Sequence, residues 1–287
     1  ILHDSISFIF SHLLIINVLL SIVVVFFQRR NPKSVWAWLL ILYFIPVLGF
    51  VFYLLIGADM HKRKMFRTKE IEDRLANAIR RQELMIRSQE LKEKYPGVTD
   101  YSDLVMYHLH TTSAILSDDN DVQFFVNGED KFAALKEDMR NAKKSIHIQY
   151  YIIKNDELFR SIVEILKDKV KEGVKVRILY DSMGCWKMRK KIWKQLEKEG
   201  IQCTEFFPAL VGRLHLRINY RNHRKIVVID DCIGYVGGFN IGKEYIDKDP
   251  KFGHWRDTHM RITGSSVTAL EARFILDWNF ADRKRLL

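Results

Sequence analysis

The chain has 287 residues, of which 48% are hydrophobic and 12% aromatic, and its formal net charge is +11. This composition excludes a disordered chain, because there is enough apolar surface to build one or two packed domains. The basic balance favours an anionic partner, either a nucleic acid or an anionic membrane surface. The three cysteines, Cys185, Cys203 and Cys232, are widely spaced. They indicate reduced cytoplasmic thiols rather than a disulfide framework or a zinc site.

Two apolar segments near the N-terminus are each long enough to cross a bilayer. The first runs from Ile6 to Phe27 and the second from Val35 to Ile56, and about 20 helical residues span the hydrocarbon core. Two tryptophans open the second segment, as interfacial anchors would. We therefore expect a transmembrane helical hairpin over residues 1–60. The alternative is a buried helical hairpin of a soluble protein.

The basic residues around these segments bear on membrane topology. Both the turn between the segments and the stretch after the second are basic, but the larger group follows the second: Lys62, Arg63, Lys64, Arg67 and Lys69. Because cytoplasmic flanks carry the excess of Lys and Arg, this favours a multi-pass protein of the cell membrane with its C-terminal domain in the cytoplasm.

Residues 61–111 are expected to form a charged helical linker. Ile71, Leu75 and Ile79 recur every four residues and make a narrow apolar stripe. The basic side chains of this helix either rest on anionic headgroups or face solvent. Pro96 and Gly97 are expected to end it.

Residues 112–287 are expected to form an α/β domain. Strands and helices alternate here, which predicts a mixed or parallel sheet flanked by helices, with ligands at the carboxyl ends of the strands. The expected strands are 122–126, 145–153, 174–180 and 202–207, and the expected helices are 129–142, 157–172 and 186–199.

The most informative stretch is N-H-R-K-I-V-V-I-D-D-C-I-G-Y-V-G-G-F-N, residues 222–240. It predicts two short strands, 225–230 and 233–236, joined by a tight turn. Residues two apart share a face of a strand, so His223 and Lys225 should project together. The returning strand should bring Gly237, Gly238 and Asn240 near His223. An imidazole, an ammonium and an amide in one place suit a phosphate, with Lys225 and Asn240 on its oxygens and His223 facing phosphorus.

The spacing H-x-K-x4-D-x6-G-G-x-N resembles the signature of the phospholipase D superfamily. Several further stretches resemble bacterial cardiolipin synthases, and the similarity covers essentially the whole chain. These stretches are residues 29–40, 148–153, 221–230, 237–242, 255–262 and 274–278.

The resemblance implies transfer of a phosphatidyl group from one phosphatidylglycerol to another, with release of glycerol. His223 would be the nucleophile and form a phosphatidyl-histidine, while Lys225 and Asn240 would bind the phosphate. Asp257 would accept a hydrogen bond from the far nitrogen of His223. Asp230 would support the site from behind, since strand parity points it away from His223.

The resemblance also bears on the rest of the site. Asn222, Gly237 and Gly238 would contact the substrate, and neither a metal nor a cofactor is expected, because side chains supply the cations. Such enzymes need two H-x-K motifs, and a single one occurs here. We expect the other from a C-terminal half of the same polypeptide, favoured by where this chain stops, or from a second copy. The remaining histidines considered are expected in packing or surface positions: His147, His215, His254 and His259.

Two alternatives to phosphatidyl transfer remain at this point. One is a phospholipase D-type hydrolase, and the other is a non-catalytic membrane protein that binds anionic lipid with an incomplete site. A nuclease of the same superfamily fits the charge but not two membrane spans, so we expect anionic phospholipid, and not nucleic acid, as the partner.

Overall fold

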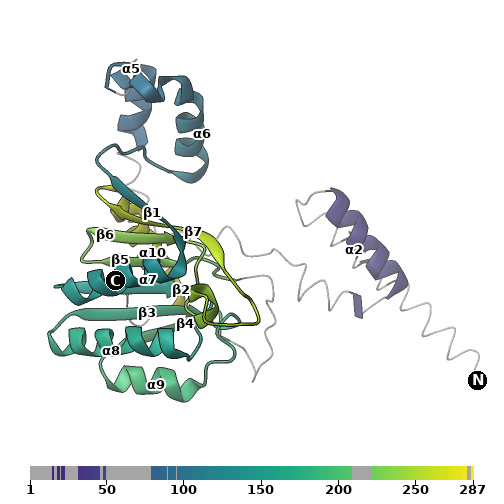
Figure 1. Cartoon of the computed structure of the whole chain (residues 1–287). Coiled ribbons are helices and arrows are strands. Elements are labelled where there is room, and N and C mark those ends of the chain that lie inside the picture. Colours follow the sequence, from purple (N-terminus) through teal and green to yellow (C-terminus); the bar gives the residue numbers. More distant parts are fainter. Residues whose placement is uncertain are drawn as a thin grey trace, which may run out of the picture. The chain divides into compact units, whose positions relative to one another are not determined.

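The computed structural model describes residues 15, 18–19, 21–22, 32–45, 48–49, 79–88, 90–94, 96–208, 221–282 and 286–287. The chain forms two compact units, one comprising Ile1–Met65 with Pro208–Arg221 and the other Phe66–Phe207 with Asn222–Leu287. The second unit contains the sheet shown in Figure 1.

This sheet has seven strands in the order β1-β7-β6-β5-β2-β3-β4. β2 to β4 are parallel neighbours, and every other pair is antiparallel, so the sheet is mixed. The strands are β1 (Asp121–Asn127), β2 (Ser145–Tyr150), β3 (Lys175–Asp181), β4 (Gln202–Phe206), β5 (Ile226–Ile229), β6 (Ile233–Gly237) and β7 (Arg256–Thr263).

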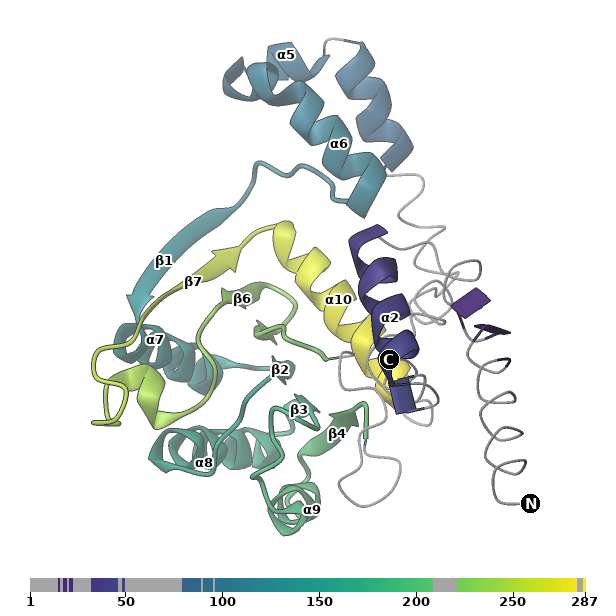
Figure 2. The same ribbon diagram turned by 90° about the vertical axis from the view of Figure 1, so that its right-hand side faces the viewer.

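Helices cover both faces of the sheet, which gives three layers (Figure 2). One face is covered by α7 (Gly128–Asn141), α8 (Glu157–Lys171) and α9 (Lys190–Lys198), and the other by α10 (Ser266–Ala281). A short 3₁₀ helix, η3 (Lys243–Ile246), follows β6. The mixed α/β architecture expected from the alternating pattern is therefore present.

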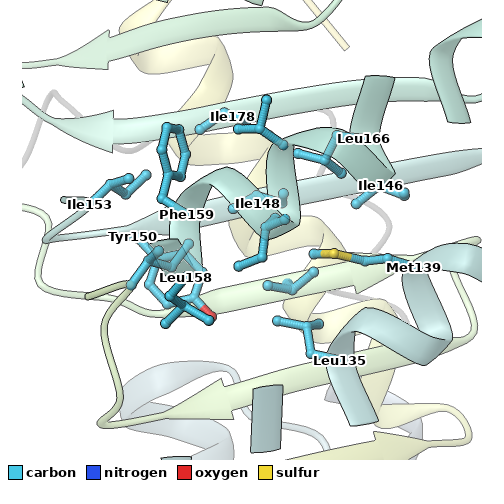
Figure 3. Packing of buried hydrophobic residues seen from close by; sticks show 14 of the residues in the cluster. Leu135, Met139, Ile146, Ile148, Tyr150, Ile153, Leu158, Phe159, Leu166 and Ile178 are labelled. Carbon is cyan, nitrogen blue, oxygen red and sulfur yellow. The ribbon is translucent and has the colours of Figure 1, made fainter. Parts of the chain in front are cut away.

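The main core lies between the sheet and the layer of α7 and α8 (Figure 3). The sequence of α8 specifies both its start and its buried side. Asp156 caps the helix by accepting a hydrogen bond from the Phe159 amide at 3.2 Å. Its apolar side is buried at helical spacing, and Gly173 follows the helix with φ of +89°. The buried apolar residues of α8 are Leu158, Phe159, Ile162, Val163 and Leu166.

Some element boundaries differ from those predicted. β2 ends at Tyr150 instead of residue 153, because the Ile152 amide donates to the Asn240 side chain and not to a strand partner. α9 begins at Lys190 instead of residue 186, because the Asp181 carboxylate draws the amides of Met183 and Gly184 into a turn. β7 and α10 lie outside the predicted elements.

The expected linker contains more structure than one helix. The helical residues 79–87 are followed by α5 (Glu90–Lys94), η2 (Pro96–Tyr101) and α6 (Ser102–Thr112). The chain thus continues into a further helix after Pro96 and Gly97. Residues 61–78, which contain most of the predicted apolar stripe, lie outside the described part of the chain.

The membrane hairpin remains a prediction. α2 (Pro32–Phe44) lies in the second apolar segment, and several of its large side chains are exposed: Trp36, Leu40, Tyr43 and Phe44. Within the described residues, no helix combines the length and apolarity needed to cross a bilayer. Most of the first segment, residues 6–27, and the basic stretch after the second lie outside those residues.

Candidate active site

The predicted site residues other than Asp230 lie at the end of the sheet where the parallel strands β2 and β3 finish. β5 begins opposite the end of β2, with Ile226 paired to Gln149, and β6 ends beside the start of β5, with Val236 paired to Ile226. The segment before β5 and the segment after β6 therefore meet where the parallel strands β2 and β3 end. Ligands in open α/β sheets bind at this end, outside the carboxyl ends of the strands.

His223 and Lys225 lie in direct contact at this end of the sheet. The Lys225 Nζ is 3.0 Å from the Nδ1 and 3.1 Å from the Nε2 of His223, and it donates to the His223 carbonyl at 2.6 Å. The Lys225 side chain is buried, whereas His223 is exposed. The pair thus presents an accessible imidazole backed by a buried ammonium.

The surroundings lower the pKa of both groups. Burial lowers the pKa of Lys225 to about 8, against the opposing influence of the Asp257 carboxylate. Burial and the Lys225 ammonium lower the pKa of His223, which Asp181 partly offsets. The lowered pKa of His223 favours the unprotonated imidazole, the form that a nucleophile requires, beside an ammonium that is largely charged at neutral pH.

The ring of Tyr151 lies beside both members of this pair, and Tyr151 was not among the residues predicted from the sequence. Its ring centroid is 4.7 Å from that of His223 and 5.6 Å from the Lys225 Nζ. It follows directly after β2, in the I-Q-Y-Y-I-I stretch. An aromatic residue one position past a buried strand at this end of the sheet is the signal that could have found it.

Asn240 lies at the same end, but its side chain is engaged in protein contacts. Its Oδ1 accepts from the Ile152 amide at 3.1 Å, and its Nδ2 donates to the Tyr245 hydroxyl at 2.9 Å. A primary amide has two N–H donors. Among the described residues no acceptor contacts the second N–H, and the other two contacts fix the orientation of the amide.

The two glycines lie against the start of β7. A Cβ on Gly237 would lie 2.5 Å from the His259 Cα, and a Cβ on Gly238 would lie 2.0 Å from the Asp257 Oδ1. The predicted reason was close approach to a ligand. In the structure it is the start of β7 that occupies this space.

Asp257 lies beside Gly238, and its negative charge partly offsets the lowering of the Lys225 pKa by burial. Its Oδ1 accepts from the Thr258 amide at 2.7 Å. Both nitrogens of His223 lie near Lys225, and among the described residues no hydrogen bond joins His223 to Asp257. The orienting role expected of Asp257 therefore remains a prediction.

Asp230 occupies the opposite end of β5 from His223. At φ of +55° it lies in the turn after β5, where its carboxylate accepts from the amides of Lys143, Lys144 and Ser145 at 2.6 to 2.9 Å. Burial acts to raise the pKa of Asp230, but these three donors outweigh it and the net pKa is lowered. Asp230 thus ties the β5–β6 hairpin to the start of β2.

Comparison with known proteins places this arrangement in a family. Residues 135–254 match the model of the "Cardiolipin synthase, PLD-like domain", where PLD denotes phospholipase D. This chain carries the phospholipase D-like domain of the cardiolipin synthase family. Residues 15–57 also match the phospholipase D-nuclease N-terminal model.

Curated relatives extend the match over most of the chain. The major cardiolipin synthase ClsA of Bacillus subtilis is 43% identical over 98% of this chain and 58% of its own length. A cardiolipin synthase of Staphylococcus aureus is 44% identical over 92% of this chain and 54% of its own length. The chain thus spans little more than half the length of these relatives. The solved structure of Nuc from Salmonella typhimurium, a phospholipase D family member, aligns at 19% identity with a TM-score of 0.44, covering 57% of this chain and 97% of that one.

Asn222 anchors the H-x-K segment of the phospholipase D-like domain. It is buried; its amide donates to the Asp181 Oδ2 at 2.9 Å, and its Nδ2 donates to the Asp277 Oδ2 at 3.0 Å. These contacts hold the backbone just before His223. The substrate contact expected for Asn222 remains a prediction, and its side chain is turned into the protein.

Asp277 is the centre of this anchor, and the sequence analysis did not select it. Its carboxylate is fully buried and accepts from Gln149 at 2.7 Å, from Asn222 and from Arg224 at 2.9 Å. It thereby joins α10, β2 and the segment that carries His223. An acid between Phe274 and Trp278, on the buried side of α10, was the available signal.

The other histidines take up structural positions where the structure describes them. His147 contacts Glu271 and Arg177, His254 pairs with Asp247, and His259 is fully buried beside Gly237. His215 lies outside the described residues. Within the part of the chain that the structure describes, no three His, Cys, Asp or Glu side chains gather as metal ligands would.

Proposed function

We propose that this protein is a phosphatidyltransferase that makes cardiolipin from two molecules of phosphatidylglycerol and releases glycerol. The observation that carries the proposal is the exposed imidazole of His223 in contact with the buried Lys225 ammonium. The likeness to cardiolipin synthases over nearly the whole chain supports the same reaction.

In the proposed first step, a ring nitrogen of His223 attacks the phosphorus of one phosphatidylglycerol. The bond from phosphorus to the glycerol headgroup breaks, and the leaving oxygen takes up a proton as glycerol departs. Lys225 and the free N–H of Asn240 hold the phosphate oxygens, where negative charge builds up in the transition state. Asp257 orients the ring and stabilises its positive charge.

In the second step, a hydroxyl of another phosphatidylglycerol attacks the phosphatidyl-histidine. That hydroxyl loses its proton, the P–N bond breaks, and cardiolipin forms with His223 restored. The sum of the two steps is two phosphatidylglycerols giving one cardiolipin and one glycerol.

Both steps need a proton donor that becomes a base. Because the Lys225 ammonium contacts both nitrogens of His223, that ring is poorly placed to serve as nucleophile and as acid at once. We assign this role to a second imidazole, from a further part of the same polypeptide or from a second copy of the chain.

The proposed lipid substrate requires a site at the membrane. Two apolar N-terminal segments and the exposed apolar side chains of α2 support a membrane-anchored, multi-pass protein. The basic residues after the second segment support a cytoplasmic catalytic domain.

The test compares lipids from cells that overproduce the wild-type protein or the His223→Asn variant. The wild type should raise cardiolipin and free glycerol together, and His223→Asn should not. His110→Asn, which alters an exposed histidine of α6, serves as the matched control and should behave as the wild type.

Other outcomes would reject the proposed reaction. Phosphatidic acid formed in place of cardiolipin would show hydrolysis of the phospholipase D type. Equal lipid profiles for the wild type and His223→Asn would show a lipid-binding protein without catalysis.

A further inference from the structure

The loop Met183–Arg189 joins β3 to α9 and is fastened to the candidate active site. Asp181, at the end of β3, binds the amides of Met183 and Gly184 through one oxygen and the amide of Asn222 through the other. A Cβ on Gly184 would lie 1.9 Å from the carbonyl oxygen of Tyr151. Since the Tyr151 ring contacts His223, the loop is linked to the site through Tyr151.

The side chains on the inner side of the loop are buried, and this packing sets which side chains face outward. Cys185 and Met188 are buried, and the Met188 amide donates to the Cys185 carbonyl at 2.8 Å. The Cys185 sulfur accepts from the Ile153 amide at 3.2 Å. Trp186 is therefore turned outward, and 58% of its surface is exposed.

Cations surround the exposed indole. Lys187 places its Nζ 5.5 Å from the Trp186 ring centroid, and three consecutive exposed cations follow at the start of α9. We call this set the Trp186 patch: Trp186, Lys187, Arg189, Lys190 and Lys191.

The cations of the Trp186 patch do not stabilise α9. The positive end of a helix dipole is its N-terminus, where acidic residues stabilise and basic residues destabilise. α7 and α8 follow this rule, with acids in their first turns, whereas α9 has none and its Arg189 cap makes no side-chain hydrogen bond. Cations kept at this position, beside an exposed indole, indicate an anionic partner outside the protein.

We propose that the Trp186 patch binds the surface of an anionic bilayer, with Trp186 inserted at the level of the headgroups. Tryptophan is enriched at this depth, since its ring is apolar and its N–H finds a partner there. Lysine and arginine around it are drawn to the negative surface potential. The patch would hold the part of the domain that carries His223 against the membrane. This contact would require neither the N-terminal segments nor turnover.

The test places an environment-sensitive fluorophore on residue 186 of the whole chain. Cys185 and Cys203 are buried and Cys232 is exposed, so Trp186→Cys in a Cys232→Ser background offers one accessible thiol. The labelled protein is reconstituted into phosphatidylcholine vesicles with or without phosphatidylglycerol. We expect a blue-shifted emission that is quenched by spin-labelled lipid, and larger effects when phosphatidylglycerol is present.

Matched variants separate the patch from general charge. Lys187→Gln/Lys190→Gln/Lys191→Gln should abolish the effect of phosphatidylglycerol on the probe. The control, with equal loss of charge at exposed positions outside the patch, should retain it: Lys171→Gln/Lys175→Gln/Lys198→Gln. His223→Asn should also retain it, because the contact does not require turnover.

Three results would overturn the proposal. The probe could stay equally exposed to water in both kinds of vesicle. It could be blue-shifted already in detergent without lipid, which would show that protein covers the patch. It could respond to an added single-stranded oligonucleotide and not to vesicles, which would indicate nucleic acid. Cardiolipin formed by such a protein would leave the proposed reaction standing while this inference falls.

Discussion

Lys225 lies close enough to His223 to lower the pKa of the imidazole. The lowered pKa of His223 keeps its lone pair free at neutral pH, and the lowered pKa of Lys225 brings the loss of its proton toward the physiological range. The proposed reaction needs the first group neutral and the second charged. The two residues are in contact as expected, but both lie before β5, so the strand parity used to predict the contact does not apply to them.

The pairing predicts the shape of the pH profile. Plotted against pH, kcat/KM should rise through a pKa below that of ordinary histidine, as His223 loses its proton, and fall near pH 8, as Lys225 loses its own. Lys225→Arg keeps the charge at every relevant pH, so it should lower the rate but remove the fall near pH 8. A fall at the same pH in both proteins would show that another group is responsible.

Tertiary hydrogen bonds explain which contacts of the site residues the sequence could not predict. Asn222 binds partners 41 and 55 positions away, and Asp230 binds amides 85 to 87 positions away. Local spacing carries no information about such contacts. Asn222 therefore looked like a residue facing the substrate, although its side chain is turned inward.

At the scale of elements, the buried carboxylate of Asp277 holds three parts of the domain together. Asp277→Ala would leave donors on Gln149, Asn222 and Arg224 without their acceptor. Breaking such a buried, charged network should cost about 3–5 kcal/mol in the free energy of unfolding. The exposed pair broken by Asp168→Ala should cost about 1 kcal/mol or less.

Denaturant unfolding of the two variants checks this difference. A midpoint for Asp277→Ala as close to wild type as that of Asp168→Ala would show that the network is dispensable. The same measurement at several denaturant concentrations also reports any change in the slope, which would indicate an altered unfolded or native state.

Two glycines at element boundaries should respond differently to substitution. A Cβ on Gly128 would lie 1.6 Å from the backbone oxygen of Tyr245, so Gly128→Ala must move backbone and should destabilise by about 1–3 kcal/mol. The three atoms nearest to a Cβ on Gly238 all belong to the movable carboxylate of Asp257. Gly238→Ala should therefore lower turnover with little change in the thermal midpoint.

Thermal unfolding and glycerol release, measured on both variants, distinguish these effects. The account would be contradicted if Gly238→Ala kept full activity, since Asp257 would then have no role that depends on its position. It would also be contradicted if Gly128→Ala left the thermal midpoint unchanged.

The predicted elements follow the sequence where burial is simple. β1 to β6 and α7 to α9 begin or end within a few residues of the predicted positions, because apolar alternation and helical spacing mark one buried face. β7 and α10 were not predicted. β7 turns His259 and Arg261 toward the protein interior, and α10 buries Asp277, so neither shows a clean apolar pattern.

At the scale of the whole molecule, the proposed reaction needs two half-sites, and the residues around His223 would form one of them. The phospholipase D-like domain supplies one imidazole and one ammonium, and the proposed reaction requires a further imidazole. The net charge of +11 suits an anionic bilayer, toward which the Trp186 patch and the membrane segments would hold the site.

The central claim is that His223 itself bonds to the lipid phosphorus. The most direct measurement is to incubate the protein with phosphatidylglycerol labelled in its phosphate, quench the reaction during turnover, and locate the label by mass spectrometry. We predict a phosphatidyl group on His223 that is absent from His223→Asn. Cardiolipin formed without label on His223, together with undiminished synthesis by His223→Asn, would contradict the account.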